Sequence, residues 1–91
     1  MKCADYTLEF GKCLKAAKKK RRNIKQLEVI INMLLNEKEL PKKYRDHALH
    51  GNMQGIRECH ITNNPDFLLL YEPFEELIIL HACGSHDELF R

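Results

Sequence analysis

Along this 91-residue chain the spacing of apolar residues changes from a helical period to a strand period close to Pro41. Residues 4–10 alternate loosely between apolar and polar side chains, which predicts a short, half-exposed strand. The period then lengthens to that of a helix over residues 10–17, and Asn23 is a suitable N-cap for a second helix over residues 24–35. We therefore predict two helices in an antiparallel hairpin, whose apolar sides must pack on a sheet.

After Pro41 the apolar period is two. Short segments around 47–50, 56–62, 67–72 and 77–83 are separated by turn residues, which predicts an antiparallel meander. The third of these segments is apolar on both faces, as expected for an interior strand, and the tail is too short for a further element of any size. The predicted fold is α+β in a single domain over residues 1–91. Its order is β-α-α-β-β-β, or one strand more, with an αα-hairpin packed on an antiparallel sheet.

Charge divides the chain into two halves. Residues 1–50 carry 13 Lys and Arg against 6 Asp and Glu, whereas residues 51–91 carry 2 Arg against 7 Asp and Glu. The positive charge is densest in the stretch Lys18–Arg22, where five successive cations exceed what the C-terminus of a helix requires. Such a surface favours a polyanionic partner, most commonly nucleic acid. A solvated helix end is the alternative, and composition leaves the two interpretations even.

Cysteine usage and hydropathy indicate a cytoplasmic protein. The four cysteines are widely spaced without a C-x-x-C motif, and acidic residues interrupt any early apolar run that could form a signal peptide. No apolar segment reaches 18 residues, so we expect no association with a membrane. The thiols are therefore expected to be reduced. These positions are Cys3, Cys13, Cys59 and Cys83.

All five histidines lie in the last 45 residues, within or near short recurrent motifs. Histidine exchanges a proton near neutral pH because its ordinary pKa is about 6.5, so several histidines along short strands favour acid–base chemistry. A basic first half followed by a histidine-bearing second half would suit a protein that binds and cleaves RNA. The motifs are DHALHG (residues 46–51), GIRECH (55–60), PDF (65–67) and GSHDELF (84–90).

These four motifs, in this order and with this spacing, resemble the YafQ-type toxins of bacterial toxin–antitoxin modules, in the RelE/ParE superfamily. The resemblance covers essentially the whole chain and implies the RelE-like, microbial RNase-type fold. It also implies a ribosome-dependent endoribonuclease, or mRNA interferase, which cuts mRNA by metal-free acid–base catalysis without a cofactor. The implied partners are the ribosome, mRNA and a cognate antitoxin, in a complex such as a heterotetramer.

Carried over residue by residue, the resemblance implies five catalytic positions. His60 and His86 are candidates for the proton transfers, and Asp66 would orient an imidazole or act as the base. His47 would bind the phosphate or orient the nucleotide, and Phe90 would stack on a base. The acid and base roles remain open at this stage.

RNA contacts are expected from a second set of residues. Phe67 would stack on a base, and Arg57 lies within a family motif. Strand alternation, however, directs Arg57 away from His60 and Glu58 unless a bulge re-aims it. The cationic run would contact ribosomal RNA through Lys18, Lys19, Lys20, Arg21 and Arg22.

Three departures from the family pattern affect these expectations. Phe67 replaces the usual tryptophan, and the turn before Pro65 is two residues longer than usual, which would displace Asp66. Ala82 stands where an arginine is common, so its charge must come from elsewhere or be missing. His50 and His81 lie outside the matched positions and are expected to be structural.

Two other functions compete with the nuclease. A ParE-like or catalytically weak relative would act as a protein-binding toxin, although such a protein would not need three histidines at the matched positions. A metal protein could use the cysteines and histidines of the second half, but Cys59 and His60 are neighbours on one strand and point to opposite faces. We therefore expect no metal. The candidate metal ligands are Cys59, His60, His81, Cys83 and His86.

Overall fold

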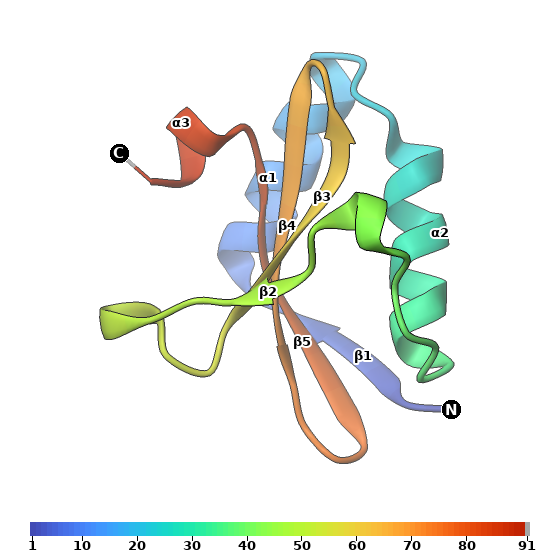
Figure 1. Ribbon diagram of the computed structural model, residues 1–91. Helices are drawn as coiled ribbons and strands as arrows, with labels where there is room; N and C mark the ends of the chain where they lie inside the picture. Colours follow the sequence, from blue (N-terminus) through green and yellow to red (C-terminus); the bar gives the residue numbers. More distant parts are fainter. Residues whose placement is uncertain (91) are drawn as a thin grey trace.

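Two long helices pack on a five-stranded sheet in the computed structural model, which describes residues 1–90 (Figure 1). One strand precedes the two helices and four follow them, in the order that the apolar spacing predicts. A third, very short helix follows the last strand. The elements are β1 (Cys3–Tyr6), α1 (Leu8–Lys19), α2 (Ile24–Leu35), β2 (His47–Ala48), β3 (Arg57–Asn63), β4 (Asp66–Pro73), β5 (Leu77–Gly84) and α3 (His86–Leu89), with single 3-10 turns at Lys42–Tyr44 and Gly51–Met53.

Side-chain caps set the beginnings of both long helices. The Asn23 side chain accepts a hydrogen bond from the backbone N–H of Gln26 at 3.0 Å, which confirms the predicted cap of α2. The Thr7 hydroxyl accepts one from the backbone N–H of Phe10, so α1 begins at Leu8. The first strand therefore ends at Tyr6, earlier than the alternation over residues 4–10 predicted.

The sheet has the order β1-β5-β4-β3-β2. Strands β2 to β5 form the predicted antiparallel meander, and β4 lies inside it with β3 and β5 on its two sides. The first strand instead pairs with β5 in parallel, which makes the sheet mixed. This parallel pairing follows from the two antiparallel helices, which carry the chain across the sheet and back before the meander begins.

The main core fills the space between the helices and one face of the sheet. Alternate residues of β4, namely Phe67, Leu69 and Tyr71, point into it, whereas Leu68 and Leu70 are buried on the opposite face. None of the helices in the described residues is long and apolar enough to cross a membrane. Helix residues in the core include Phe10, Ala17, Leu27 and Ile30.

A β-bulge in β3 adjusts the hairpin that leads to the predicted site. His60 pairs with Leu68 and Thr62 pairs with Phe67, so Ile61 of β3 has no pairing partner in β4. The hairpin closes with Asn63 opposite Asp66. The longer turn thus leaves Asp66 as the first residue of β4, where its carboxylate reaches the start of α3.

Candidate active site

A buried carboxylate joins two of the predicted catalytic histidines. The pairing of β2 with β3 places His47 opposite Glu58, and His60 follows two residues later on the same face of β3. The Oε1 atom of Glu58 lies 3.5 Å from Nε2 of His47 and 3.4 Å from Nε2 of His60. The two Nε2 atoms are therefore less than 7 Å apart. Glu58 itself is only 5% exposed.

The groups around His47 determine where its ring carries protons. Its Nδ1 lies 2.6 Å from the backbone carbonyl oxygen of Arg45, which can only accept a hydrogen bond, so Nδ1 carries a proton. The other nitrogen, Nε2, faces the carboxylate of Glu58. His47 thus lies between two acceptors, the carbonyl oxygen of Arg45 at Nδ1 and the carboxylate of Glu58 near Nε2.

The ring of His60 has a different environment. Nε2 of His60 lies 3.4 Å from the Glu58 carboxylate, so a proton on Nε2 leaves Nδ1 with a free lone pair. No residue among 1–90 forms a hydrogen bond with that Nδ1 atom. The neighbouring β4 residues, Leu68 and Leu70, add no charge. An imidazole held this way can accept a proton at Nδ1 while the carboxylate stabilises the resulting cation, as in a carboxylate–histidine pair of a hydrolase.

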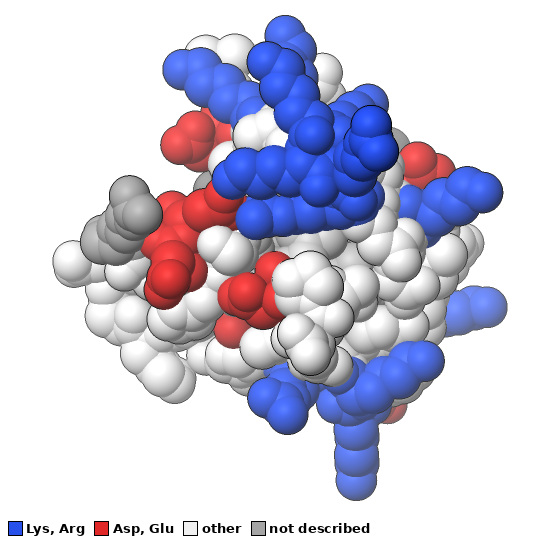
Figure 2. Space-filling model, turned by 90° about the horizontal axis from the view of Figure 1, so that it is seen from above, with Lys and Arg blue, Asp and Glu red and all other residues white. Residues whose placement is uncertain are grey.

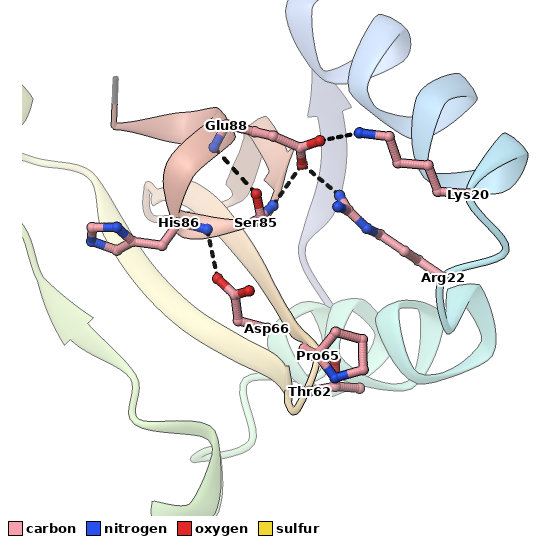
Figure 3. A network of polar contacts seen from close by, with 8 residues as sticks. All are labelled: Lys20, Arg22, Thr62, Pro65, Asp66, Ser85, His86 and Glu88. Carbon is pink, nitrogen blue, oxygen red and sulfur yellow. Dashed lines mark hydrogen bonds and ion pairs between the residues drawn. The ribbon is translucent and has the colours of Figure 1, made fainter.

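Asp66 and His86 meet through the backbone. The Asp66 carboxylate accepts a hydrogen bond from the backbone N–H of His86 at 2.7 Å, so it fixes the start of α3 and does not hold an imidazole. The His86 ring is exposed, packs against Phe90 with ring centroids 4.9 Å apart, and points away from Asp66 (Figure 3). His60 and Gly84 lie in one row across β3, β4 and β5 through their pairing with Leu68. Gly84 is therefore two strands across the sheet from His60, and α3 begins two residues after it, at His86.

The cationic run lies at the end of the molecule where α1 meets α2, and its side chains form one cluster bordered by acidic groups (Figure 2). Lys18, Lys19 and Arg21 are exposed. Lys20 and Arg22 instead form ion pairs with Glu88 of α3. Within residues 1–90, the cationic run therefore divides into three exposed cations without an ion pair and two, Lys20 and Arg22, that pair with Glu88.

Phe67 cannot stack on a base in this structure, which corrects the expectation from its motif. It is 1% exposed because it shares the core face of β4 with Leu69 and Tyr71. The guanidinium of Arg22 covers its ring, 5.6 Å from the centroid. Position 67 therefore contributes to the core and supports Arg22 by a cation–π contact.

Arg57 points away from the histidines, as strand alternation predicted, so the structure does not bring it to their face of the sheet. Its guanidinium pairs with Asp46, with Nη2 to Oδ2 at 3.2 Å, and the Tyr71 hydroxyl donates to the same carboxylate at 2.5 Å. This hydrogen bonding by Asp46 raises the pKa of Arg57, against some desolvation. Burial, followed by the bond to Asp46, raises the pKa of Tyr71.

Position 82 lacks the usual arginine, but a cation lines the same cavity as Ala82. Ala82 and Arg22 line the same cavity of about 560 Å³ between α1, β5 and α3, together with Glu88 and Leu89. Arg22 reaches this cavity from the connection between α1 and α2. Its charge is thus present near position 82, although Glu88 partly neutralises it.

The candidate metal ligands do not gather around one point. Nε2 of His81 lies 3.0 Å from Oε1 of Glu72, an isolated pair on adjacent strands. Cys59 is buried on the core face, and burial raises the pKa of Cys59 and of Cys83 to about 12, so both remain protonated thiols. Among residues 1–90, no three His, Cys, Asp or Glu side chains are arranged to hold a metal ion.

Two acidic residues of this region were missed by sequence reasoning. Alternation put Glu58 on the face of His60, but a two-residue strand such as β2 gave no signal that His47 would lie opposite. Glu88 stands three residues after Ser85, in the spacing of a capping box, which could have marked it as the anchor of a helix.

Comparison with known proteins identifies the family of this chain. A model of the family described as "Bacterial toxin of type II toxin-antitoxin system, YafQ" matches residues 2–91. The chain is 31% identical over 87 residues to the mRNA interferase toxin YafQ of Escherichia coli strain K12, covering 94% of this chain and 92% of that protein.

Solved structures of related toxins have the same fold. YafQ in the E. coli DinJ–YafQ complex superposes with a TM-score of 0.90 at 29% identity, over the full length of both chains. A metal-bound toxin from Helicobacter pylori superposes with a TM-score of 0.89 at 37% identity, over 99% of this chain and all of that one. The family match, the length of the alignment and the fold together show that this chain belongs to the YafQ family of bacterial toxins of type II toxin–antitoxin systems.

Proposed function

We propose that this toxin is an endoribonuclease that cuts mRNA on the ribosome by metal-free acid–base catalysis. The observation that carries the proposal is the convergence of His47 and His60 on one buried carboxylate, Glu58. The E. coli relative is named an mRNA interferase, which supports the same activity here. The proposed catalytic residues are His47, His60, Asp66, His86 and Phe90.

The first proton transfer in this proposal uses His60. Its Nδ1 takes the proton of the ribose 2′-hydroxyl, and Glu58 stabilises the imidazolium that forms. The freed 2′-oxygen attacks the adjacent phosphorus, and the bond from phosphorus to the 5′-oxygen breaks. The products are a 2′,3′-cyclic phosphate and a 5′-hydroxyl end.

The remaining residues act on the phosphate and the leaving group. His47 faces Glu58 through Nε2, and its protonated form provides positive charge for the phosphorane-like transition state. His86 is exposed at the start of α3 and gives the leaving 5′-oxygen its proton. Asp66 sets the position of His86 through the backbone, and Phe90 packs on the His86 ring and offers a surface to a base.

Docking on the ribosome is proposed for the cationic run. Lys18, Lys19 and Arg21 are exposed beside one another at one end of the molecule and would contact the phosphates of ribosomal RNA. Lys20 and Arg22 belong to the same run, but their charge is partly neutralised by Glu88. Arg57 and Phe67 are not included, because one pairs with Asp46 and the other is buried.

A cognate antitoxin is the proposed protein partner. The E. coli YafQ toxin has been crystallised with DinJ, and a basic nuclease that is toxic to its own cell must be neutralised. We expect a net acidic antitoxin segment that covers part of the cationic run or the histidine site. Copurification with the product of a neighbouring gene would support this. Harmless expression of the folded toxin alone would contradict it.

Expression of the chain alone in bacteria, with primer extension on a defined translated message, tests the nuclease. We expect new 5′ ends within the coding region, and cleavage that persists in the presence of EDTA. Growth arrest with intact messages would contradict the proposal and favour a ParE-like toxin that acts on a protein. Cleavage that requires a divalent ion supplied to the toxin would contradict the metal-free mechanism.

A further inference from the structure

The helix that carries His86 is too short to hold its own position. It spans four residues, His86–Leu89, whereas isolated helices shorter than about 12 residues are marginal in water. His86 is its first residue and Phe90 follows its last. The placement of both side chains therefore depends on contacts between α3 and the rest of the molecule.

Two carboxylates provide these contacts from opposite sides. Asp66 accepts the backbone N–H of His86, as described above. Glu88, the third residue of α3, accepts the backbone N–H of Ser85 at 2.8 Å in a capping box. The same carboxylate accepts from Arg22 at 2.6 Å and pairs with Lys20, so it links α3 to the connection between α1 and α2 (Figure 3).

The fold leaves a specific place for the Glu88 carboxylate. A Cβ atom added at Gly84 would lie 2.8 Å from Glu88 Oε1, so the absence of a side chain there allows the carboxylate to approach the end of β5. The bonds from Arg22, Lys20 and the Ser85 N–H hold the pKa of Glu88 well below its ordinary value. Glu88 is thus ionised at neutral pH and is held by three donors.

We infer that Glu88 is a positioning residue for RNA cleavage, which ties the helix that carries His86 to the cationic connection between α1 and α2. The inference rests on the proposed function, because it gives His86 a part in the chemistry. Glu88 acts through α3: its loss leaves the chemical groups in place but lets the His86 ring move. Small misplacements of a reacting group can cost up to about 10²-fold in rate.

Asp87 provides a matched control. It is the neighbouring carboxylate of the same short helix, it is exposed, and within residues 1–90 it forms no ion pair or side-chain hydrogen bond. Glu88→Gln and Asp87→Asn each remove one negative charge from α3. Only Glu88→Gln removes the link to Arg22 and Lys20.

The first measurement is made without RNA or ribosomes. Backbone ¹⁵N order parameters of residues 85–90 should be near the rigid value of about 0.85 in the parent and in Asp87→Asn, and below about 0.6 in Glu88→Gln. Arg22→Gln should also lower the order parameters of these residues. The double variant Arg22→Gln/Glu88→Gln should lower them no further than Glu88→Gln alone. Order parameters of β4 and β5 should not change.

The second measurement is single-turnover cleavage of a ribosome-bound message. Glu88→Gln should lower the maximal rate by about 10-fold to 100-fold, while the toxin concentration at half-saturation stays unchanged. Asp87→Asn should cleave like the parent. A purely structural role predicts the opposite pattern. Partial unfolding would lower the amount of active toxin, which raises the toxin concentration at half-saturation and leaves the maximal single-turnover rate unchanged.

The parent protein alone provides a test that does not depend on the folding of any variant. The ion pairs of Glu88 are partly exposed, so raising NaCl from about 0.1 M to about 1 M should screen them and lower the order parameters of α3. Equal α3 order parameters in the parent, in Glu88→Gln and at both salt concentrations would overturn the inference. Undiminished cleavage by His86→Ala would instead contradict the proposed function and leave the link between Glu88 and α3 intact.

Discussion

Single residues of the site differ mainly in what surrounds their ring nitrogens. His47 has an acceptor at both nitrogens, whereas His60 has one acceptor and one open nitrogen. The ring of His86 contacts Phe90 and is exposed. His81 faces Glu72 on the neighbouring strand, outside the matched motifs. These surroundings, rather than the number of histidines, assign different chemistry to each.

Replacement of His86 by alanine should lower message cleavage by about 10² to 10⁴-fold, the range expected when a proton-transfer group is removed. The exposed ring contributes little buried surface, so the midpoint of urea unfolding should stay close to that of the parent. Primer extension in a translation extract measures the cleavage. His81→Ala is the control and should cut normally. The assignment of the C-terminal motif is wrong if His81→Ala loses cleavage and His86→Ala retains it.

Replacement of Glu58 by glutamine tests the carboxylate between the two histidines. The side chain keeps its shape, but it no longer places a negative charge beside His47 or stabilises an imidazolium at His60. We expect cleavage to fall by one to two orders of magnitude, less than the ~10²–10⁴-fold expected for loss of a proton-transfer group.

Glu72→Gln is the matched control for Glu58→Gln, because it also removes a carboxylate paired with a histidine on a strand. It should leave cleavage unchanged. Long-range ¹H–¹⁵N spectra of the imidazole rings should show a proton on Nδ1 of His47 in the parent and in Glu58→Gln, because both keep the hydrogen bond to the carbonyl oxygen of Arg45. A parent spectrum with His47 unprotonated at Nδ1 would contradict the assigned hydrogen bond to Arg45.

The wrong placement of Phe67 from the sequence has a physical cause. Residues 67–71 are apolar at every position, so the pattern could not tell which side chains face the helices. Phe67 was therefore expected at the surface, where the motif suggested it, although it lies in the core with Leu69. Arg57 was correctly oriented by alternation because polar and apolar residues differ along β3.

At the scale of elements, periodicity was sufficient for the helices and for the long strands. The cap at Asn23 and the meander over β3, β4 and β5 were both predicted. The parallel pairing of β1 with β5 was not, because β1 has four residues and its partner is distant in sequence. The register that places His47 opposite Glu58 was not predicted either, because the two residues of β2 carry no alternation that would fix it.

The anchoring of α3 should depend on pH in a defined direction. The pKa of Glu88 is lowered in the folded protein, first by Arg22 and then by Lys20, relative to an ordinary value of 4.5. A carboxylate with a lowered pKa contributes stability above its unfolded-state value and loses it as the pH falls through the folded-state value. The free energy of unfolding should therefore be higher in the parent than in Glu88→Gln at neutral pH.

This difference should shrink as the pH falls below about 4.5, where the unfolded state begins to bind the proton. Urea denaturation of the parent and of Glu88→Gln at neutral pH and near pH 3 measures it. Asp87→Asn is again the control, and its difference from the parent should stay small at both values. A difference between the parent and Glu88→Gln that grows on acidification would show that Glu88 does not favour the folded state through its charge.

At the scale of the whole molecule, folding brings the basic and acidic halves of the chain into contact. The acidic C-terminal half supplies Glu88, which neutralises part of the basic run of the N-terminal half. The cluster seen in Figure 2 is therefore not uniformly available to a polyanion. Within residues 1–90, Lys18, Lys19 and Arg21 form no ion pair and are exposed. Composition predicts the excess of positive charge in the N-terminal half, but not which of its cations pair with Glu88.

Reversal of the three exposed cations, in the variant Lys18→Glu/Lys19→Glu/Arg21→Glu, should weaken binding to the ribosome and flatten its dependence on salt. Each lost phosphate contact reduces the slope of log K against log salt by about 0.7–0.9, so three should reduce it by about 2–3. Filter binding across a salt series measures both quantities, and the Lys20 and Arg22 pairs with Glu88 are left in place. Lys38→Glu/Lys42→Glu/Lys43→Glu changes the net charge equally at other exposed positions, so it isolates the effect of location. Equal slopes for the two triple variants would mean that net charge, and not the run at the α1–α2 connection, governs docking.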